Sequence, residues 1–121
     1  MVKLLVRNTA DAAALLGTDF GWYCGMAYMA TYASGNTLQV VTKSCALGYF
    51  SFGHELGHNF GCHHNPEVAT NFYFSHGHGH LIEQGSAITG YRTVLAYNAE
   101  GHSTRVNYYS NPRDGLCNSI L

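Results

Sequence analysis

A group of histidine residues near the middle of the chain has the spacing of a metal site. Residues 54–64 read HELGHNFGCHH, which contains the pattern H-E-x-x-H. Because residues i and i+4 of a helix lie on one face, His54 and His58 can point two imidazoles at a single ion. Glu55 is then close to the ion but rotated away from ligating it, which suits a base that acts on zinc-activated water. The pattern predicts a zinc centre with a carboxylate general base.

A third ligand requires the chain to bend after the helix. Gly61 is suited to that bend because glycine adopts the left-handed conformation without steric cost. His64 then completes the longer pattern H-E-x-x-H-x-x-G-x-x-H. Zinc with three protein ligands and one open position is the catalytic arrangement, whereas structural zinc usually has four ligands. We therefore expect one catalytic Zn²⁺ held by His54, His58 and His64, with His63 as an exposed neighbour; the alternative is a run of surface histidines.

A second histidine-rich segment follows. His76, His78 and His80 alternate with glycine, so they would share one face if the segment were a strand. Two interpretations stay open: a second metal site, and an exposed loop after the helix.

The four cysteines are even in number and contain no CxxC pair, which makes a zinc ribbon unlikely. Cys24 and Cys45 flank a predicted hairpin, so we favour a disulfide between them. Cys62 and Cys117 would then pair by elimination, although four cysteines permit three pairings. Cys62 as a zinc ligand is a weaker alternative. Even cysteines and low charge fit a secreted protein.

The residue pattern predicts a few regular elements. Residues 24–32 and 37–42 indicate two strands, and the turn residues at 34–36 join them into a hairpin. Residues 49–60 have the period of a helix. Residues 11–16 form either a buried strand or a helical turn.

Length and composition limit the class of protein. The chain has 121 residues, 46% apolar and 11% charged, which favours one folded domain over 1–121 and excludes a disordered chain. A formal net charge of -1 gives no basic surface for nucleic acid or an anionic membrane. No apolar run is long enough to cross a bilayer, and we recognise no signal peptide in residues 1–16.

Several segments together resemble one family of enzymes. HELGHNFG at 54–61 is similar to the zinc helix of the metzincin peptidases, within them the reprolysin-like (adamalysin-like) family. CGMAY at 24–28, residues 45–52, GYRTVLAY at 90–97 and YYSNP at 108–112 match the same family in the same order. The set is similar in particular to the branch of the peptidyl-Asp metalloendopeptidases.

The resemblance implies an α+β fold and a reaction. We expect a partial metzincin-like catalytic domain, with a twisted sheet whose edge strand lies over the zinc helix, and without the strands and long helix that the family has before this point. The activity implied is that of a zinc-dependent endopeptidase that cleaves extended protein or peptide substrates outside the cell, with Glu55 as general base. The alternative is a catalytically silent zinc-binding domain or fragment. A histidine-rich metal-binding module without hydrolytic activity is a third hypothesis.

The resemblance also assigns supporting residues. Leu95 stands where the family has the methionine of its Met-turn; because the two side chains are close in volume, we expect an apolar floor beneath the zinc. Tyr97 matches a tyrosine that can approach the metal, or is a packed aromatic. Arg92 either selects acidic substrate side chains or only braces the turn. The residues expected to bind substrate are Gly25, Met26, Ala27, Tyr28, Arg92 and Tyr97.

Overall fold

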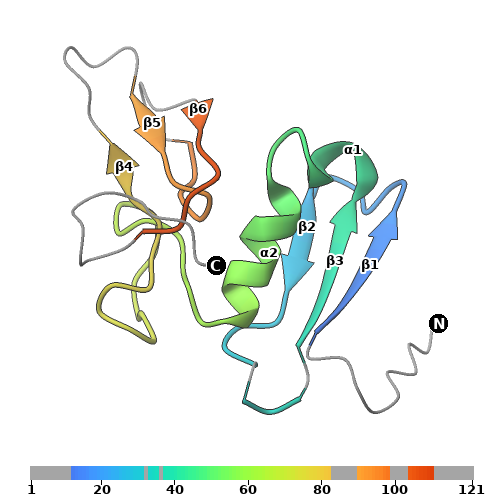
Figure 1. Ribbon diagram of the computed structural model, residues 1–121, viewed down its shortest axis with the longest axis horizontal. Helices are drawn as coiled ribbons and strands as arrows, with labels where there is room; N and C mark the ends of the chain where they lie inside the picture. Colours follow the sequence, from blue (N-terminus) through green and yellow to red (C-terminus); the bar gives the residue numbers. More distant parts are fainter. Residues whose placement is uncertain (1–11, 32, 36, 83–89, 99–103, 111–121) are drawn as a thin grey trace.

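The computed structural model describes residues 12–31, 33–35, 37–82, 90–98 and 104–110. These residues form two small three-stranded sheets and two helices (Figure 1). In chain order the elements are β1 (Ala13–Gly17), β2 (Gly25–Ala27), β3 (Leu38–Thr42), α1 (Lys43–Ala46), α2 (Ser51–Asn59), β4 (Leu81–Ile82), β5 (Tyr91–Arg92) and β6 (Thr104–Arg105).

The first sheet has the strand order β1-β3-β2. β1 runs parallel to β3, and β2 pairs with β3 in the antiparallel sense, so the predicted hairpin is present. The strand predicted over 24–32 was too long, because only Gly25–Ala27 is β-strand. After Ala27 the chain leaves the sheet for the end of α2, where the amides of Ala30 and Thr31 bond the carbonyls of His58 and Asn59.

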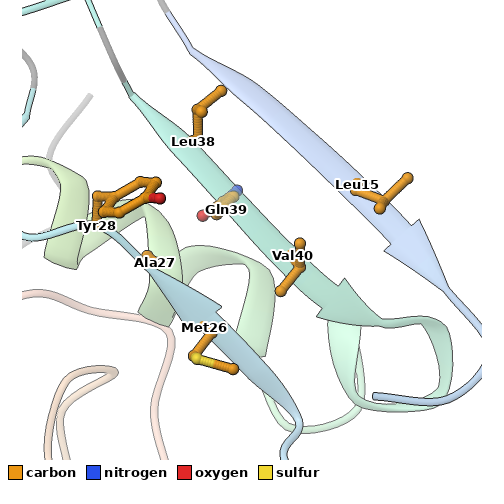
Figure 2. Close-up of a pocket in the computed structure, with 7 residues that line it drawn as sticks. All are labelled: Leu15, Met26, Ala27, Tyr28, Leu38, Gln39 and Val40. Carbon is orange, nitrogen blue, oxygen red and sulfur yellow. The ribbon is translucent and has the colours of Figure 1, made fainter. Parts of the chain in front are cut away.

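The two faces of this sheet differ. α2 packs on one face against β2 and β3, where Gln39 and Val41 are buried (Figure 1). Side chains alternate between faces along a strand, so the neighbours of these residues point the other way. On that opposite face an apolar hollow is lined mainly by Leu15, Met26, Tyr28, Leu38 and Val40 (Figure 2).

The predicted metal-binding helix is present as α2, and a glycine turn ends it. Gly61 has a φ of 91°, its amide bonds the carbonyl of His58, and the amide of Cys62 bonds that of Gly57. Paired bonds around a left-handed residue form a Schellman motif, which reverses the chain direction after a helix. This reversal lets residues 62–64 return toward the helix.

The segments after α2 pack on its other side. His63 and His78 form a parallel bridge, β4 pairs with β5, and β5 pairs with β6. After β5, residues 93–96 form a fully buried turn. In this turn the Ala96 amide donates a hydrogen bond to the Thr93 carbonyl. Figure 1 shows α2 lying between the two sheets.

The predicted disulfide between Cys24 and Cys45 is present, with the two Cα atoms 5.5 Å apart. It joins the start of β2 to the buried side of α1. The Cys62–Cys117 pairing cannot be compared, because Cys117 lies outside the described residues; within them Cys62 has no disulfide partner. Mixed sheets and helices agree with the expected α+β class, and neither described helix has the length and apolar character of a membrane span.

Candidate metal centre

Three histidine side chains converge beside α2, two from the helix and one from the segment after it. The Nε2 atom of His58 lies 3.1 Å from that of His54 and 3.1 Å from that of His64, and the Nε2 atoms of His54 and His64 are 3.3 Å apart. His54 and His58 are buried and His64 is half-buried. The three predicted ligands therefore share one point in space, although they come from a helix and from the segment beyond the glycine bend.

Hydrogen bonds to backbone carbonyls fix the protonation of two of these rings. His54 Nδ1 lies 2.8 Å from the Val94 carbonyl oxygen, and His58 Nδ1 lies 2.8 Å from that of Cys62. A carbonyl only accepts, so each Nδ1 must carry the proton and donate it. In a neutral imidazole the Nε2 atom is then a lone-pair acceptor. The Nε2 lone pairs of His54 and His58 therefore face each other, an arrangement that a bound cation would stabilise.

The donor set and spacing fit zinc. Ligands about 2.0–2.1 Å from a tetrahedral ion lie about 3.3 Å from each other, close to the observed separations. Burial, with the neighbouring His58, lowers the pKa of His54 to about 3 and that of His64 to about 4. Burial also lowers the pKa of His58. All three rings are therefore neutral at pH 7, the form that ligates metal, so the triad is able to bind one zinc ion.

The buried turn at residues 93–96 packs against α2. Its Val94 carbonyl orients His54, as described above. Leu95 is 2% exposed and packs on Gly57, where an added Cβ would lie 2.6 Å from Leu95 Cδ2. Gly57 stands between the two helical ligands in sequence, so the apolar Leu95 side chain packs against the helix next to them.

The third ligand is held by an aromatic ring. Tyr97 stacks on His64 with the ring centroids 3.7 Å apart and the planes at 29°. The amide of Tyr97 donates to Asn65 Oδ1 at 2.9 Å, and Asn65 is fully buried. Because Asn65 follows His64 directly, one short segment carries both the ligand and the group that anchors its stacking partner.

Glu55 lies between α2 and the edge strand β2. Its carboxyl group is packed on Gly25, where an added Cβ would be 2.6 Å from Oε1. Burial raises the pKa of Glu55 to about 7, while the charge of Arg105 lowers it. A bound divalent cation nearby would lower it further. No hydrogen bond or ion pair within the described residues engages this carboxyl group, so it is available to a ligand.

The residues expected to bind substrate on and next to β2 differ in the groups that they expose, which are backbone groups in some and side chains in others. Cys24 and Tyr28 bond Thr42 and Leu38 of the neighbouring segment through their backbone, so the alternating pattern directs the backbone of Gly25 and Ala27 to the open edge. The side chains of Met26 and Tyr28 are exposed. Arg92 is half-buried and donates to Asn98 Oδ1 at 3.1 Å.

The second histidine segment does not form a metal cluster. In the part of the chain that the structure describes, the group His54, His58 and His64 is the one that could hold an ion. His78 Nδ1 lies 2.8 Å from the Gly79 carbonyl oxygen, and its ring packs near Phe72. His63 is half-buried rather than exposed, because its backbone pairs with Gly77 and Gly79.

Three residues around the site were not singled out from the sequence. Asn65 anchors Tyr97, the Tyr109 hydroxyl donates to the Gly53 carbonyl on α2, and the Arg105 side chain bonds the carbonyls of Tyr49 and Ala96. Asn65 directly follows the metal motif and precedes a proline, a signal that could have drawn attention to it. Arg105 carries no such signal, and Tyr109 lies in the YYSNP segment, which matches the family without indicating a role for that residue.

Comparison with known proteins identifies the family to which the chain is similar. The sequence model described as "Metallo-peptidase family M12B Reprolysin-like" matches residues 6–65, which include all three histidines. Proteins named peptidyl-Asp metalloendopeptidase are similar along most of the chain. This chain belongs to the reprolysin-like metallopeptidases.

The similarity to individual relatives covers much of this chain but less of theirs. The peptidyl-Asp metalloendopeptidase of Stenotrophomonas maltophilia (strain K279a) is 38% identical over 111 residues, 88% of this chain and 26% of the relative. That of Pseudomonas fragi is 40% identical over 81 residues, 67% of this chain and 53% of the relative. That of Xanthomonas campestris pv. campestris is 32% identical over 109 residues. The chain thus spans a quarter to about half of these relatives, and no solved structure matches it significantly.

Proposed function

We propose that this reprolysin-like metallopeptidase chain carries the metal centre and general base of a zinc endopeptidase, and that it hydrolyses peptide bonds in extended substrates. The observation that carries the proposal is the convergence of the three Nε2 atoms at 3.1–3.3 Å beside a buried carboxylate. A structural zinc site would be closed by a fourth protein ligand. Among the described residues no fourth histidine, cysteine or carboxylate joins the three.

In the proposed reaction Glu55 moves the proton. When bound, zinc supplies Lewis acidity, which polarises a carbonyl oxygen and lowers the pKa of water. Glu55 accepts the proton of the attacking water at a carboxylate oxygen and delivers it to the nitrogen of the leaving amine, as the scissile C–N bond breaks. Val94 and Cys62 keep the metal-binding imidazoles in the required tautomer through their carbonyls. Leu95 supports the site with apolar contacts.

The open edge of β2 supports binding of an extended peptide. Gly25 and Ala27 present backbone N–H and C=O groups there, and a peptide strand can add to such an edge by main-chain hydrogen bonds. Gly25 also packs on Glu55, so a peptide on this edge would lie beside the general base. This arrangement favours extended chains over folded ones.

We propose a preference for aspartyl peptides and a site of action outside the cytosol. The preference rests on the similar proteins, which are named peptidyl-Asp metalloendopeptidases. The location rests on the Cys24–Cys45 disulfide, because such bonds persist in oxidising compartments.

The test compares the zinc-loaded chain with its Glu55→Gln variant on an unstructured protein substrate such as reduced, alkylated casein. We expect cleavage by the wild-type chain that a chelator abolishes and zinc restores. In Glu55→Gln we expect hydrolysis to fall by at least about 1000-fold while one zinc ion stays bound. Glu67→Gln, which changes an exposed carboxylate that bonds Asn65, is the matched control and should retain cleavage.

Two outcomes would overturn the proposal. Full hydrolysis by Glu55→Gln would remove its role as base. A wild-type chain that binds one zinc and cleaves no peptide would instead establish the silent zinc-binding domain.

A further inference from the structure

Arg105 on β6 is a cation that has no anionic partner among the described residues. Its Nη1 donates to the Tyr49 carbonyl at 2.8 Å and its Nη2 to the Ala96 carbonyl at 3.3 Å. Its Nε is buried and has no hydrogen-bond acceptor within the part of the chain that the structure describes. No carboxylate of the described residues pairs with it. A partly buried charge is costly unless an opposite charge compensates it, so this guanidinium is suited to receive an anion.

Its position is beside the metal centre. The Ala96 carbonyl that Arg105 bonds belongs to the residue before Tyr97, whose ring stacks on the ligand His64 at 3.7 Å. Two residues before Ala96, Val94 orients the ligand His54. The Tyr49 carbonyl lies just before α2, so Arg105 bridges the approach to the metal-binding helix and the turn beneath it.

The charge of Arg105 reaches the groups of the site. It lowers the pKa of His54, Glu55 and His64, and that of Tyr97. Burial, together with the neighbouring Arg92, lowers the pKa of Arg105 itself to about 10, so it stays charged at pH 7. The positive field therefore extends over the place where a substrate would be cleaved.

We propose that Arg105 binds the carboxylate of an acidic substrate residue next to the scissile bond, and so determines a preference for that residue. This inference rests on the proposed peptidase function. A guanidinium has five N–H donors, of which the two named carbonyls use two, and carboxylates bind such donors in pairs.

The sequence suggested Arg92 as the residue that selects acidic substrate side chains, but the structure places Arg105 in closer connection with the metal centre than Arg92. The two are Cα partners on β5 and β6, so they lie on neighbouring strands. The Arg92 side chain donates to Asn98, one residue beyond Tyr97, whereas Arg105 reaches the buried turn itself. We therefore assign the main recognition to Arg105.

The test uses two fluorogenic peptides that are identical except for Asp or Asn at one position beside the cleavage site. The ratio of kcat/KM for the Asp and Asn peptides is measured for the wild-type chain and for Arg105→Gln, Arg105→Lys and Arg92→Gln. We expect the wild-type chain to prefer Asp by at least about tenfold, and Arg105→Gln to reduce the ratio to about one to two. Arg105→Lys, which keeps the charge, should have an intermediate ratio, and Arg92→Gln should retain most of the preference.

A control variant distinguishes recognition of the carboxylate by Arg105 from a general effect of positive charge on the protein. Lys43→Gln removes an exposed positive charge on α1, outside the metal centre, and should leave the ratio unchanged. Zinc stoichiometry measured on every variant reports whether Arg105 only supports the structure. If Arg105→Gln does not fold, Arg105→Lys and the salt dependence of the wild-type chain replace it. Added salt should then weaken cleavage of the Asp peptide more than that of the Asn peptide.

Binding of the same peptides to Glu55→Gln, followed by fluorescence anisotropy, separates the two proposals. Absent cleavage by the wild-type chain, with an Asp preference in binding that Arg105→Gln removes, would contradict the peptidase function and support Arg105. Cleavage whose Asp/Asn ratio is the same in wild type and Arg105→Gln would overturn the role of Arg105 and leave the peptidase function standing. A wild-type chain that prefers neither peptide, or an equal loss of preference in Lys43→Gln, would also overturn it.

Discussion

Gly25 on the edge strand and Glu55 on the metal-binding helix are in direct contact: a Cβ atom at residue 25 would lie 2.6 Å from both Cγ and Oε1 of Glu55. The strand and the helix are far apart in sequence, yet the carboxyl group can occupy its position only because residue 25 has no side chain. The same residue presents backbone groups to the open edge of the sheet. The proposed general base and the proposed peptide-binding edge are thus in direct contact.

We expect Gly25→Ala to displace Glu55 and to lower kcat/KM by at least about tenfold, because a displacement of about 1 Å in a catalytic group has effects of this order or larger. Zinc affinity should change little, since the three atoms nearest to an added Cβ at residue 25 all belong to Glu55 and not to a ligand. Gly48→Ala is the matched control, because the nearest atom to an added Cβ there is Ser44 O at 3.8 Å. Unchanged hydrolysis in Gly25→Ala would mean that the contact has no part in positioning the base.

The apolar floor at Leu95 tests whether the site requires methionine. We expect Leu95→Met to change the free energy of unfolding by less than about 1.5 kcal/mol and to retain zinc, because the two side chains are similar in volume. Leu95→Ala should cost about 2–5 kcal/mol, since it opens a cavity under Gly57. Urea unfolding of the zinc-free proteins measures the change in the free energy of unfolding for both variants. Equal stability of Leu95→Ala and the wild type would show that the floor is not packed.

Asn65 is expected to hold the third ligand through Tyr97. Asn65→Ala removes the acceptor of the part-buried Tyr97 amide, which costs about 0.5–1.5 kcal/mol of stability. Because the Tyr97 ring stacks on His64, zinc affinity should also fall. Glu67→Ala removes only the exposed partner of Asn65 and serves as the control. Zinc titration with a competing chelator gives the affinities; equal values for Asn65→Ala and Glu67→Ala would contradict this role.

We expect the Tyr109 hydroxyl to make the free energy of unfolding decrease at alkaline pH. Burial raises the pKa of its hydroxyl from 10 to about 12, so the unfolded chain loses this proton at lower pH than the folded one. The folded state then binds more protons than the unfolded state above pH 10, and stability decreases as pH rises. From about pH 9 to about pH 11 we expect a loss of about 1 kcal/mol from this group, reduced from the full linkage value by its partial exposure.

Tyr109→Phe should lack this alkaline component. Comparison of urea unfolding of the two proteins at both pH values removes the contribution of other tyrosines. The same pH dependence in Tyr109→Phe and wild type would contradict the assignment to Tyr109.

The parts of the site that could be predicted are those that local sequence determines. The i, i+4 spacing of His54 and His58 and the left-handed preference of Gly61 act within one helix and its end, and the structure has both. The hairpin follows from the turn residues between two β-prone segments in the same way. Patterns of this kind depend on neighbours in the chain.

The remaining features depend on contacts between distant segments. β2 is shorter than predicted because residues 30 and 31 bond the end of α2, which no pattern within 24–32 indicates. The strands β4, β5 and β6 have two residues each, too few for a period-2 pattern. Arg105 is a single charged residue in sequence, and its importance appears only when its side chain is seen to reach Tyr49 and Ala96.

The central claim is that three imidazoles bind one zinc ion, and zinc-edge X-ray absorption of the zinc-loaded chain tests it most directly. We predict one zinc per chain, with nitrogen scatterers at about 2.0–2.1 Å whose imidazole pattern is lost in His64→Ala. A sulfur scatterer at about 2.3 Å, which would come from a cysteine such as Cys62, or a spectrum that His64→Ala leaves unchanged, would contradict the account.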